Sequence, residues 1–318
     1  MTKLTLTVAS AEMIAEDIKE FRLERPDKAA LPAFTSGAHI HVDVPSGGTR
    51  QYSLVNDPVD DTQYVIAVKR EAGGTGGSVS LIDSVDTGDT IEVSEPQNDF
   101  ELSDKTGDVL LVAGGIGITP ILSMARVLSR TGKRRFRLAY LTRSPELTAY
   151  RQEILDGPLA EVSTIHHDRG NPEDAFDLDT FLQPLDDVEV YCCGPTGLLA
   201  AVRDKTSGWP RGCVHFEDFG TDTPAERSGD EAFVVVIKET GARYVVPPGK
   251  TILEVLTEQG LDAPSSCEAG TCGTCRTKLV DGEADHRDLV LFDDEYDDNI
   301  IICCSRAKTP EITISFEA

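Results

Sequence analysis

Four cysteines near the carboxyl end of the chain limit its fold more than any other feature. Cys267, Cys272 and Cys275 have the spacing C-x4-C-x2-C, and Cys303 follows after 27 intervening residues. Plant-type [2Fe-2S] clusters are bound by thiolates in this pattern, three from one loop and one from a later segment. The spacing therefore predicts a C-terminal domain that carries one electron at a time.

The loop between these cysteines must fold back on itself so that four thiolates converge on two irons. Gly270 and Gly273 permit such a path, because glycine adopts positive φ without a steric cost. A four-cysteine zinc site is one alternative, but zinc usually takes two C-x2-C pairs and this chain has a single one. A disulfide framework is the other. Such frameworks belong to small secreted domains, whereas this chain begins MTKLTLTVAS, without an apolar signal segment.

The size and charge of the chain exclude several classes of protein. Its 318 residues predict two or three domains. With 55 acidic residues, 30 basic residues and a formal net charge of −25, it lacks the basic patches of nucleic-acid-binding proteins. No stretch approaches the roughly 18 consecutive apolar residues of a membrane helix. We therefore expect no membrane span and a cytoplasmic location.

The acidic residues are spread through the chain, with one local cluster after the third cysteine: Asp293, Asp294, Glu295, Asp297 and Asp298. We interpret this cluster as a solvated face or an adaptation to salt. The alternative is a docking surface for a basic redox partner, because complementary charge raises the rate of encounter.

The first segment, residues 1–102, predicts an antiparallel β-barrel. Its apolar residues alternate with polar ones over short runs at 4–8, 39–44, 64–69 and 90–93. Short alternating runs separated by Gly, Pro and Asp turns are typical of this fold.

The second segment, residues 103–221, alternates strand and helix as a doubly wound α/β domain does. A continuous apolar run at 109–113 predicts a buried parallel strand, and a helical pattern follows from Thr119 to about Leu128. The remaining elements are expected as strands at 137–141, 163–166 and 188–192, and as helices at 146–155 and 197–205.

Residues 222–232 are polar and are interpreted as a linker. The third segment, 233–318, is expected to form an α+β domain of the β-grasp type. It opens with a hairpin over 233–246, and a short helix over 251–259 ends at Gly260. The cysteine loop comes next.

Two stretches of the first segment have the chemistry to bind a phosphorylated ring cofactor. Arg50-Gln-Tyr52-Ser53 supplies a guanidinium fork, a flat ring and a hydroxyl. The glycine-rich run over 69–78 exposes backbone N–H groups that can cradle a phosphate at a helix start. Each stretch by itself is weak evidence, since the first also suits an ordinary strand.

Two stretches of the second segment suit a dinucleotide. The run over 114–120 (GGIGITP) follows the buried strand, so that its glycines allow close approach and a helix N-terminus faces the pyrophosphate. It departs from G-x-G-x-x-G and is not the standard dinucleotide fingerprint. Cys193-Gly-Pro ends a later strand, where a buried free cysteine is the alternative interpretation.

In this order the motifs resemble the ferredoxin–NADP reductase superfamily. With the C-terminal cysteines, the whole chain is similar to the family of phthalate dioxygenase and vanillate O-demethylase reductases. The order flavin, nicotinamide, iron–sulfur supports this family, because other oxygenase reductases place the cluster first. The stretches 281–288 and 303–307 also resemble it. Cys303 matches the family's Cys-x-Ser-Arg and is expected to be the fourth ligand, with Cys304 as the alternative.

The resemblance implies FMN as the flavin and assigns most of its site. Arg50, Tyr52 and Ser53 would contact the flavin, with Ser53 near its N5 atom. The phosphate would lie at Gly77, Ser78 and Val79, with added charge from Lys69 and Arg70. Phe216 would lie near the ring, and the alternative is an ordinary buried strand aromatic.

The resemblance also implies a nicotinamide coenzyme at the second segment. The nucleotide would be bound by Gly114, Gly115, Gly117, Thr119, Arg143 and Ser144. Cys193 would lie beside the nicotinamide. An arginine near the ribose binds a 2′-phosphate, whereas an acidic residue prefers the free 2′-hydroxyl, and Ser144 stands where phthalate dioxygenase reductase has an acid. We expect NADH, with NADPH as the alternative.

The function implied is that of the reductase component of a two-component Rieske-type oxygenase. The chain contains no C-x-H…C-x2-H Rieske pattern, so a partner oxygenase would activate oxygen. Hydroxylation or O-demethylation of an aromatic acid is the expected reaction, and a monomer is the expected state. Two alternatives stay open: a reductase for another oxygenase or a cytochrome P450, and a redox-sensing protein that carries flavin and cluster without turnover.

Overall fold

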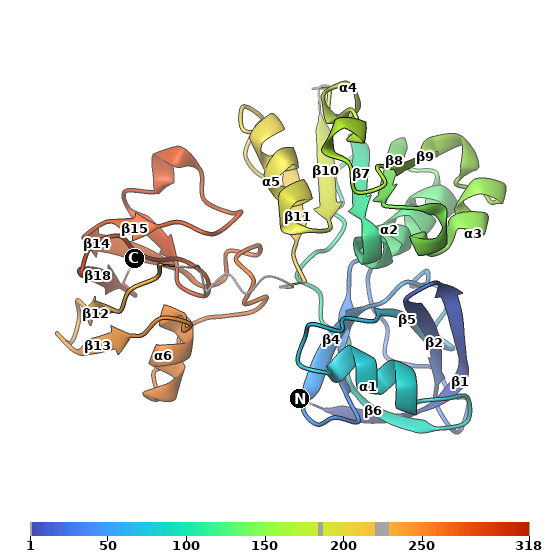
Figure 1. Cartoon of the computed structure of the whole chain (residues 1–318), viewed down its shortest axis with the longest axis horizontal. Coiled ribbons are helices and arrows are strands. Elements are labelled where there is room, and N and C mark those ends of the chain that lie inside the picture. Colours follow the sequence, from blue (N-terminus) through green and yellow to red (C-terminus); the bar gives the residue numbers. More distant parts are fainter. Residues whose placement is uncertain (1, 184–186, 220–228, 318) are drawn as a thin grey trace. The chain divides into compact units, whose positions relative to one another are not determined.

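The computed structural model describes residues 2–183, 187–219 and 229–317. They divide into two compact units, which adjoin in the sequence at His215 and Phe216. The first unit contains an antiparallel sheet and a parallel sheet, and the second contains a smaller mixed sheet with a short helix (Figure 1). No helix in this part of the chain is long and apolar enough to cross a membrane. Most of the predicted linker lies outside the described residues.

Six antiparallel strands form the first sheet, in the order β4-β3-β6-β1-β2-β5. Their bounds are β1 Lys3–Ala15, β2 Ile18–Glu24, β3 His39–Asp43, β4 Thr49–Ser53, β5 Tyr64–Lys69 and β6 Thr90–Ser94, and helix α1 spans Gly77–Ser84. Alternate apolar residues, such as Leu6 and Val8 of β1, point into one core. A bridge between Leu54 and Ile66 joins the two edges, so the expected barrel is confirmed.

Five strands form the second sheet, in the order β11-β10-β7-β8-β9. The strands are β7 Asp108–Gly114, β8 Phe136–Thr142, β9 Ser163–His167, β10 Val188–Cys193 and β11 Val214–Glu217. The helices are α2 Ile118–Thr131, α3 Arg151–Asp156, α4 Leu178–Phe181 and α5 Thr196–Lys205. The apolar run at 109–113 lies in β7 and is fully buried. After β9 the chain crosses to β10 on the other side of β7, so the strand order reverses between β7 and β10.

One apolar core joins the barrel to the parallel sheet within the first unit. Val55 and Val65 from the barrel belong to the same cluster of buried side chains as Ile121 from α2. On the same helix, Ser123 Oγ donates to the Asn56 carbonyl oxygen at 2.9 Å. Helix α2 therefore packs on both sheets.

The second unit is the expected α+β domain. Its sheet order is β13-β12-β18-β14-β16, with β12 and β18 parallel and the other pairs antiparallel. The strands are β12 Phe233–Ile237, β13 Arg243–Val246, β14 Arg276–Asp281, β16 Asn299–Ile301 and β18 Glu311–Ser315, and a small ladder joins β15 Ala284–Asp285 to β17 Arg306–Ala307. Helix α6 (Ile252–Glu258) begins at a capping box, in which Thr251 and Glu254 bond each other's backbone N–H groups.

One expected helix is shorter than its sequence pattern suggests. The pattern predicts a helix over 146–155, whereas the structure has a single 3-10 turn, Pro145–Leu147, followed by α3 from Arg151. Tyr150 interrupts the two because its φ is 58°, in the left-handed region that a continuous helix does not contain. Side-chain periodicity carries no signal for such a local backbone reversal.

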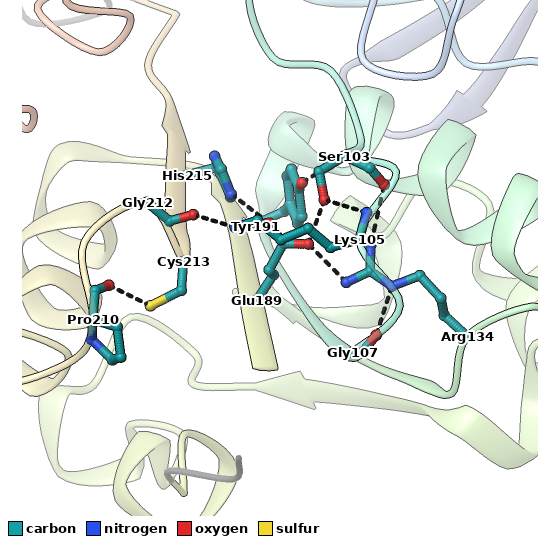
Figure 2. Close-up of polar contacts among 10 residues, drawn as sticks. All are labelled: Ser103, Lys105, Gly107, Arg134, Glu189, Tyr191, Pro210, Gly212, Cys213 and His215. Atoms are coloured by element: carbon teal, nitrogen blue, oxygen red, sulfur yellow. Dashed lines mark hydrogen bonds and ion pairs between the residues drawn. The ribbon is translucent and has the colours of Figure 1, made fainter. Parts of the chain in front are cut away.

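A buried carboxylate on β10 ties distant segments of the first unit together (Figure 2). Glu189 is 2% exposed. Its Oε2 accepts from Ser103 Oγ and, at 2.7 Å, from Arg134 Nη2, and its Oε1 lies 3.0 Å from His215 Nε2 and 3.1 Å from Lys105 Nζ. Ser103 and Lys105 belong to the connection between the two sheets, and His215 belongs to β11. The carboxylate therefore holds both segments against β10.

The same contacts make Glu189 a strong acid. Burial by itself would raise the pKa of Glu189, but the hydrogen bonds lower it from 4.5 to about 2. A carboxyl group whose pKa is lower in the folded chain contributes stability above its unfolded pKa. That contribution is lost as the pH falls from about 4.5 to about 2.

Replacing Glu189 should therefore destabilise the first unit in a pH-dependent way. We expect Glu189→Gln to lower the free energy of unfolding by about 3 kcal/mol at neutral pH, because Arg134 would stay buried without its counter-charge. Urea titrations followed by the fluorescence of Trp209 measure this difference, which should shrink below pH 4.5 as Glu189 itself is protonated. Glu161→Gln removes an exposed acid of the same unit and serves as the control. Equal losses in both variants would contradict the assigned role.

Candidate functional site

Strand β4 carries Arg50, Tyr52 and Ser53 at one edge of the barrel sheet. The Arg50 guanidinium donates to the Thr49 carbonyl oxygen at 2.6 Å and to the Thr75 hydroxyl. Tyr52 is half-buried, and burial raises the pKa of its phenol to about 12, although Arg50 acts in the opposite direction. The ring therefore stays neutral and offers a flat, largely apolar surface.

The glycine-rich run brings a helix start beside Arg50. Gly76 has a φ of 86°, and α1 begins at the next residue. A Cβ atom on Gly77 would lie 2.8 Å from the Nε atom of Arg50, so any side chain there would displace the guanidinium. Ser78 and Val79 follow in the first turn of α1. Backbone N–H groups at a helix start and an adjacent guanidinium are features that bind phosphate.

The other two cations predicted for the phosphate have acidic neighbours. Lys69 Nζ lies 3.9 Å from the Glu71 carboxylate, and Arg70 is paired with Asp83 of α1. Ser78 Oγ accepts from the Glu71 N–H at 3.0 Å. The structure thus brings the predicted phosphate residues together around α1, with the Arg50 side chain packed against Gly77 at the helix start.

The surroundings of Ser53 show whether a flavin would fit beside strand β4. The residue is 3% exposed, and its Oγ atom has no hydrogen-bond partner within the described part of the chain. Leaving a buried hydroxyl unsatisfied costs about 1–3 kcal/mol. A polar ring atom of a bound flavin would satisfy this hydroxyl, so the residues present fit the group.

The two nicotinamide motifs meet at the carboxyl ends of β7 and β10. In the parallel register Cys193 pairs with Ala113. A Cβ atom on Gly117 would lie 2.2 Å from the Cys193 carbonyl oxygen, and one on Gly114 would lie 2.7 Å from the Pro195 ring. Only glycine permits these approaches. This edge is also where the strand order reverses, the place at which doubly wound sheets bind ligands.

Two other residues of the glycine turn have different surroundings. Gly115 has a φ of 55°, and no heavy atom of the described residues lies within 4 Å of its Cβ position, so a ligand can approach the backbone there. Thr119 is 2% exposed, and its hydroxyl donates to the Ile116 carbonyl oxygen at 3.0 Å. Thr119 therefore shapes the turn.

Arg143 and Ser144 follow β8, the strand beside β7. Arg143 is exposed, and the Ser144 carbonyl oxygen accepts from Thr148 Oγ1 at 2.7 Å. Sequence reasoning missed Arg169, whose N–H donates to the Arg143 carbonyl oxygen at 3.0 Å and brings a second arginine to this loop. The Asp-Arg-Gly turn after β9 was the available signal.

Cys193 and Phe216 lie on neighbouring strands. Cys193 is fully buried at the end of β10 and belongs to the apolar core that the two sheets share. The adjacent Cys192 is equally buried, and burial raises the pKa of its thiol. Phe216 is 8% exposed on β11 and follows His215, whose ring stacks on Tyr191 with 4.4 Å between centroids. Phe216 begins the second unit, and its place at the flavin stays a prediction.

The four predicted cluster ligands converge in the second unit as two pairs. Cys267 and Cys272 lie within hydrogen-bonding reach of each other, as do Cys275 and Cys303, and Cys267 interacts electrostatically with both members of the second pair. Four thiolates on two irons means two for each iron, so this pairing fits a [2Fe-2S] cluster. Within residues 2–183, 187–219 and 229–317, no three His, Cys, Asp or Glu side chains are grouped to hold a single metal ion.

Polar groups of the loop point toward these sulfur atoms. The Ala269 N–H donates to Cys267 Sγ at 3.5 Å, and Cys272 Sγ lies 3.3 Å from the Thr274 hydroxyl. The hydrogen bond with Cys272 holds the pKa of Cys267 well below the usual value of a thiol. Hydrogen bonds to the sulfurs are one means by which a protein sets a cluster's potential.

The packing of Cys304 favours Cys303 as the fourth ligand. Cys304 is fully buried, and its Sγ lies 2.6 Å from the position that a Cβ on Gly270 would occupy. Gly270 has a φ of 74°, and its carbonyl oxygen accepts from the Leu289 N–H at 2.9 Å. Cys304 thus fills the space under the loop, whereas Cys303 faces Cys275.

These features define the class of the protein as a flavin and iron–sulfur oxidoreductase. Strand β4 and helix α1 of the barrel suit a flavin, the turn after β7 suits a nucleotide, and the second unit brings four cysteines together. Two family models match: "Oxidoreductase FAD-binding domain" over residues 5–102 and "2Fe-2S iron-sulfur cluster binding domain" over 235–308. The phthalate 4,5-dioxygenase oxygenase reductase subunit of Pseudomonas putida is 48% identical over 310 residues, 97% of this chain and 95% of that protein. The vanillate O-demethylase oxidoreductase of Pseudomonas putida is 37% identical over 313 residues, 96% of this chain and 98% of that protein.

The solved structure of phthalate dioxygenase reductase is similar over almost the whole chain. It superposes with a TM-score of 0.71 at 49% identity, covering 99% of this chain and 98% of that one. The chain belongs to the phthalate dioxygenase reductase family. The expected fold class, the flavin and [2Fe-2S] domains and the oxidoreductase class are thereby confirmed.

The contact between Gly117 and Cys193 leads to a kinetic prediction. Gly117→Ala should slow flavin reduction by NAD(P)H roughly tenfold or more, because the methyl group would push apart the two strand ends that are predicted to position the nicotinamide. Anaerobic stopped-flow absorbance measures this rate. Gly208→Ala is the matched control, since no heavy atom of the described residues lies within 4 Å of its Cβ position. A wild-type rate in the Gly117 variant would show that the site tolerates the displacement.

Proposed function

We propose that this chain is the reductase component of a two-component Rieske-type oxygenase and that it uses NADH, FMN and one [2Fe-2S] cluster. The observation that carries the proposal is the presence of three parts in this order on one chain. The two relatives compared above match this chain over almost their full length and are named as a reductase subunit of phthalate 4,5-dioxygenase and an oxidoreductase of vanillate O-demethylase. We propose a comparable role here, with an aromatic acid as the oxygenase substrate.

The proposal assigns each cofactor to residues. The flavin set is Arg50, Tyr52, Ser53, Lys69, Arg70, Gly77, Ser78, Val79 and Phe216. The nucleotide set is Gly114, Gly115, Gly117, Thr119, Arg143, Ser144 and Cys193. The cluster ligands are Cys267, Cys272, Cys275 and Cys303. Three observations support these assignments. Arg50 lies beside the start of α1, the glycine turn after β7 packs on the end of β10 where the strand order reverses, and the four cysteines converge as two pairs.

The bound cofactors supply the redox chemistry, in which a hydride is accepted and electrons leave singly. The residues of this chain bind and orient. Arg50 would neutralise a phosphate, and Tyr52 would cover one side of the ring. Ser53 would hold a hydrogen bond to the ring, and Cys193 would border the nicotinamide. No side chain is required as a general base.

The proposal also covers the partner and the organisation of the chain. The partner is a Rieske non-haem iron oxygenase, and the reductase acts as a monomer. The domains are 1–102 for the flavin, 103–221 for the nucleotide and 233–318 for the cluster, with 222–232 as a linker.

An anaerobic visible spectrum of the purified protein tests this function directly. Before NADH we expect flavin bands near roughly 450 nm with a broad iron–sulfur shoulder. Both should bleach in part after one equivalent of NADH, which supplies two of the three electrons that the flavin and the cluster accept together, and further with more NADH. A protein that contains both chromophores but does not respond to NADH would instead be the redox-sensing protein. Reduction of a co-purified cytochrome P450 in place of a Rieske protein would change the partner and leave the reductase assignment intact.

The electron route gives a second test. Cys272→Ser should abolish cytochrome c reduction and leave flavin reduction by NADH within about twofold of wild type, because only the cluster lies downstream of the flavin. Steady-state and anaerobic assays on one preparation separate the two steps. Cys213→Ser, a buried cysteine of the first unit, is the control and should leave both rates unchanged. Cytochrome c reduction that survives loss of the cluster would make the proposed route wrong.

Coenzyme preference provides a third test. Wild-type protein should show a higher kcat/KM for NADH than for NADPH. Arg143→Ala should lower kcat/KM for NADPH by roughly tenfold and leave that for NADH unchanged, because only NADPH carries a 2′-phosphate that Arg143 could bind by a charge-assisted hydrogen bond. An equal loss of kcat/KM for both coenzymes would mean that Arg143 contacts a part of the nucleotide that NADH and NADPH share.

A further inference from the structure

Several buried polar atoms of the described barrel lack a hydrogen-bond partner, and two of them, His39 Nδ1 and Ser53 Oγ, belong to residues that lie directly opposite each other on adjacent strands. His39 on β3 is 2% exposed and Ser53 on β4 is 3% exposed. Neither His39 Nδ1 nor Ser53 Oγ forms a hydrogen bond within residues 2–183, 187–219 and 229–317. A buried polar group without a partner is unfavourable, so native proteins seldom leave two in one place unless a ligand or an ordered water satisfies them.

The strand register brings these two residues together. His39 pairs directly with Ser53 across the antiparallel β3–β4 ladder. Residues directly opposite each other project from the same face of a sheet, with Cβ atoms about 4.5–5.5 Å apart. Two groups that can each donate and accept a hydrogen bond are therefore neighbours on the strand that carries the flavin motif.

The other side of His39 is already occupied. Its backbone exchanges two hydrogen bonds with Gln97, at 2.8 and 3.0 Å, and the Gln97 side chain also bonds the ring. Burial lowers the pKa of His39 to about 4, and the neighbouring Asp99 acts in the opposite direction, so the imidazole is neutral at pH 7. A neutral imidazole has two nitrogens with different roles. Gln97 uses one of them, and Nδ1 remains.

We propose that His39 is a further residue of the flavin site and that His39 Nδ1 and Ser53 Oγ together form a two-point hydrogen-bonding site for the polar edge of the flavin ring. The inference rests on the proposed function, because it extends the assignment of β4 to the flavin. It explains why a histidine, and not an apolar residue, is buried opposite Ser53. The ligand class is a ring with adjacent donor and acceptor atoms.

Two substitutions separate the two nitrogens of His39. The Asn side chain places its amide near the position of Nδ1, and the Gln side chain places its amide near the position of Nε2. We expect His39→Gln to weaken FMN binding about tenfold, the equivalent of one hydrogen bond, and His39→Asn to stay within about threefold of wild type. Flavin-free protein titrated with FMN, followed by quenching of flavin fluorescence, gives both dissociation constants without reference to turnover.

His41 provides the matched control. It lies on the same strand and face, its Nδ1 is also unpartnered among the described residues, and its ring contacts that of His39 at 5.4 Å, but it pairs with Gln51 instead of Ser53. We expect His41→Gln to bind FMN as wild type does. An equal loss in the His41 variant would attribute the effect to general packing of the barrel.

Other outcomes would overturn the proposal. If His39→Asn loses affinity for FMN and His39→Gln keeps it, the ring nitrogen that matters is the one bonded to Gln97. His39 would then act through its contact with Gln97 and not through the flavin. Unchanged affinity in both would indicate an ordered water between His39 and Ser53. If the variants fail to fold, nitrogen NMR of the wild type decides, since the His39 Nδ1 signal must move when FMN binds. A wild-type protein that binds no flavin would refute the proposed function instead, a result distinct from any difference between variants.

Discussion

The approach of Gly117 to the Cys193 carbonyl oxygen is the contact on which the rest of the first unit depends. It lets the turn after β7 lie directly on the end of β10 and so fixes where α2 begins. Helix α2 then carries Ile121 into the core that it shares with the barrel. One glycine-dependent contact thus sets the turn after β7 and, through helix α2, the packing of the barrel segment that follows β4.

Buried polar groups in this protein are of two kinds, and the difference has functional meaning. Glu189 is surrounded by donors, and this satisfied network holds β11 and the connection between the sheets. His39 and Ser53 are equally buried, but each keeps an atom without a partner among the described residues. The first arrangement fixes the scaffold, and the second marks a place where the scaffold is completed by something it binds.

Much of the fold could be predicted because its signals are local. The cysteine spacing, the apolar run of β7 and the alternating strands each follow from a few neighbouring residues. The interruption at Tyr150 could not be predicted, because a left-handed residue leaves no trace in side-chain periodicity. His39 was missed for another reason. A single histidine in an alternating strand looks like any core residue until the register shows that it lies opposite Ser53.

The core shared by the two sheets has a consequence for how this protein unfolds and how it can vary. Val55 and Val65 are buried against side chains that come from the parallel sheet and its helix, so a fragment ending near residue 102 would expose an apolar surface that the intact chain covers. The first unit should therefore melt as one cooperative body, with no state in which one sheet is folded and the other is not. A change on one side of this shared core must be matched on the other, so the two sheets of the first unit are expected to vary together.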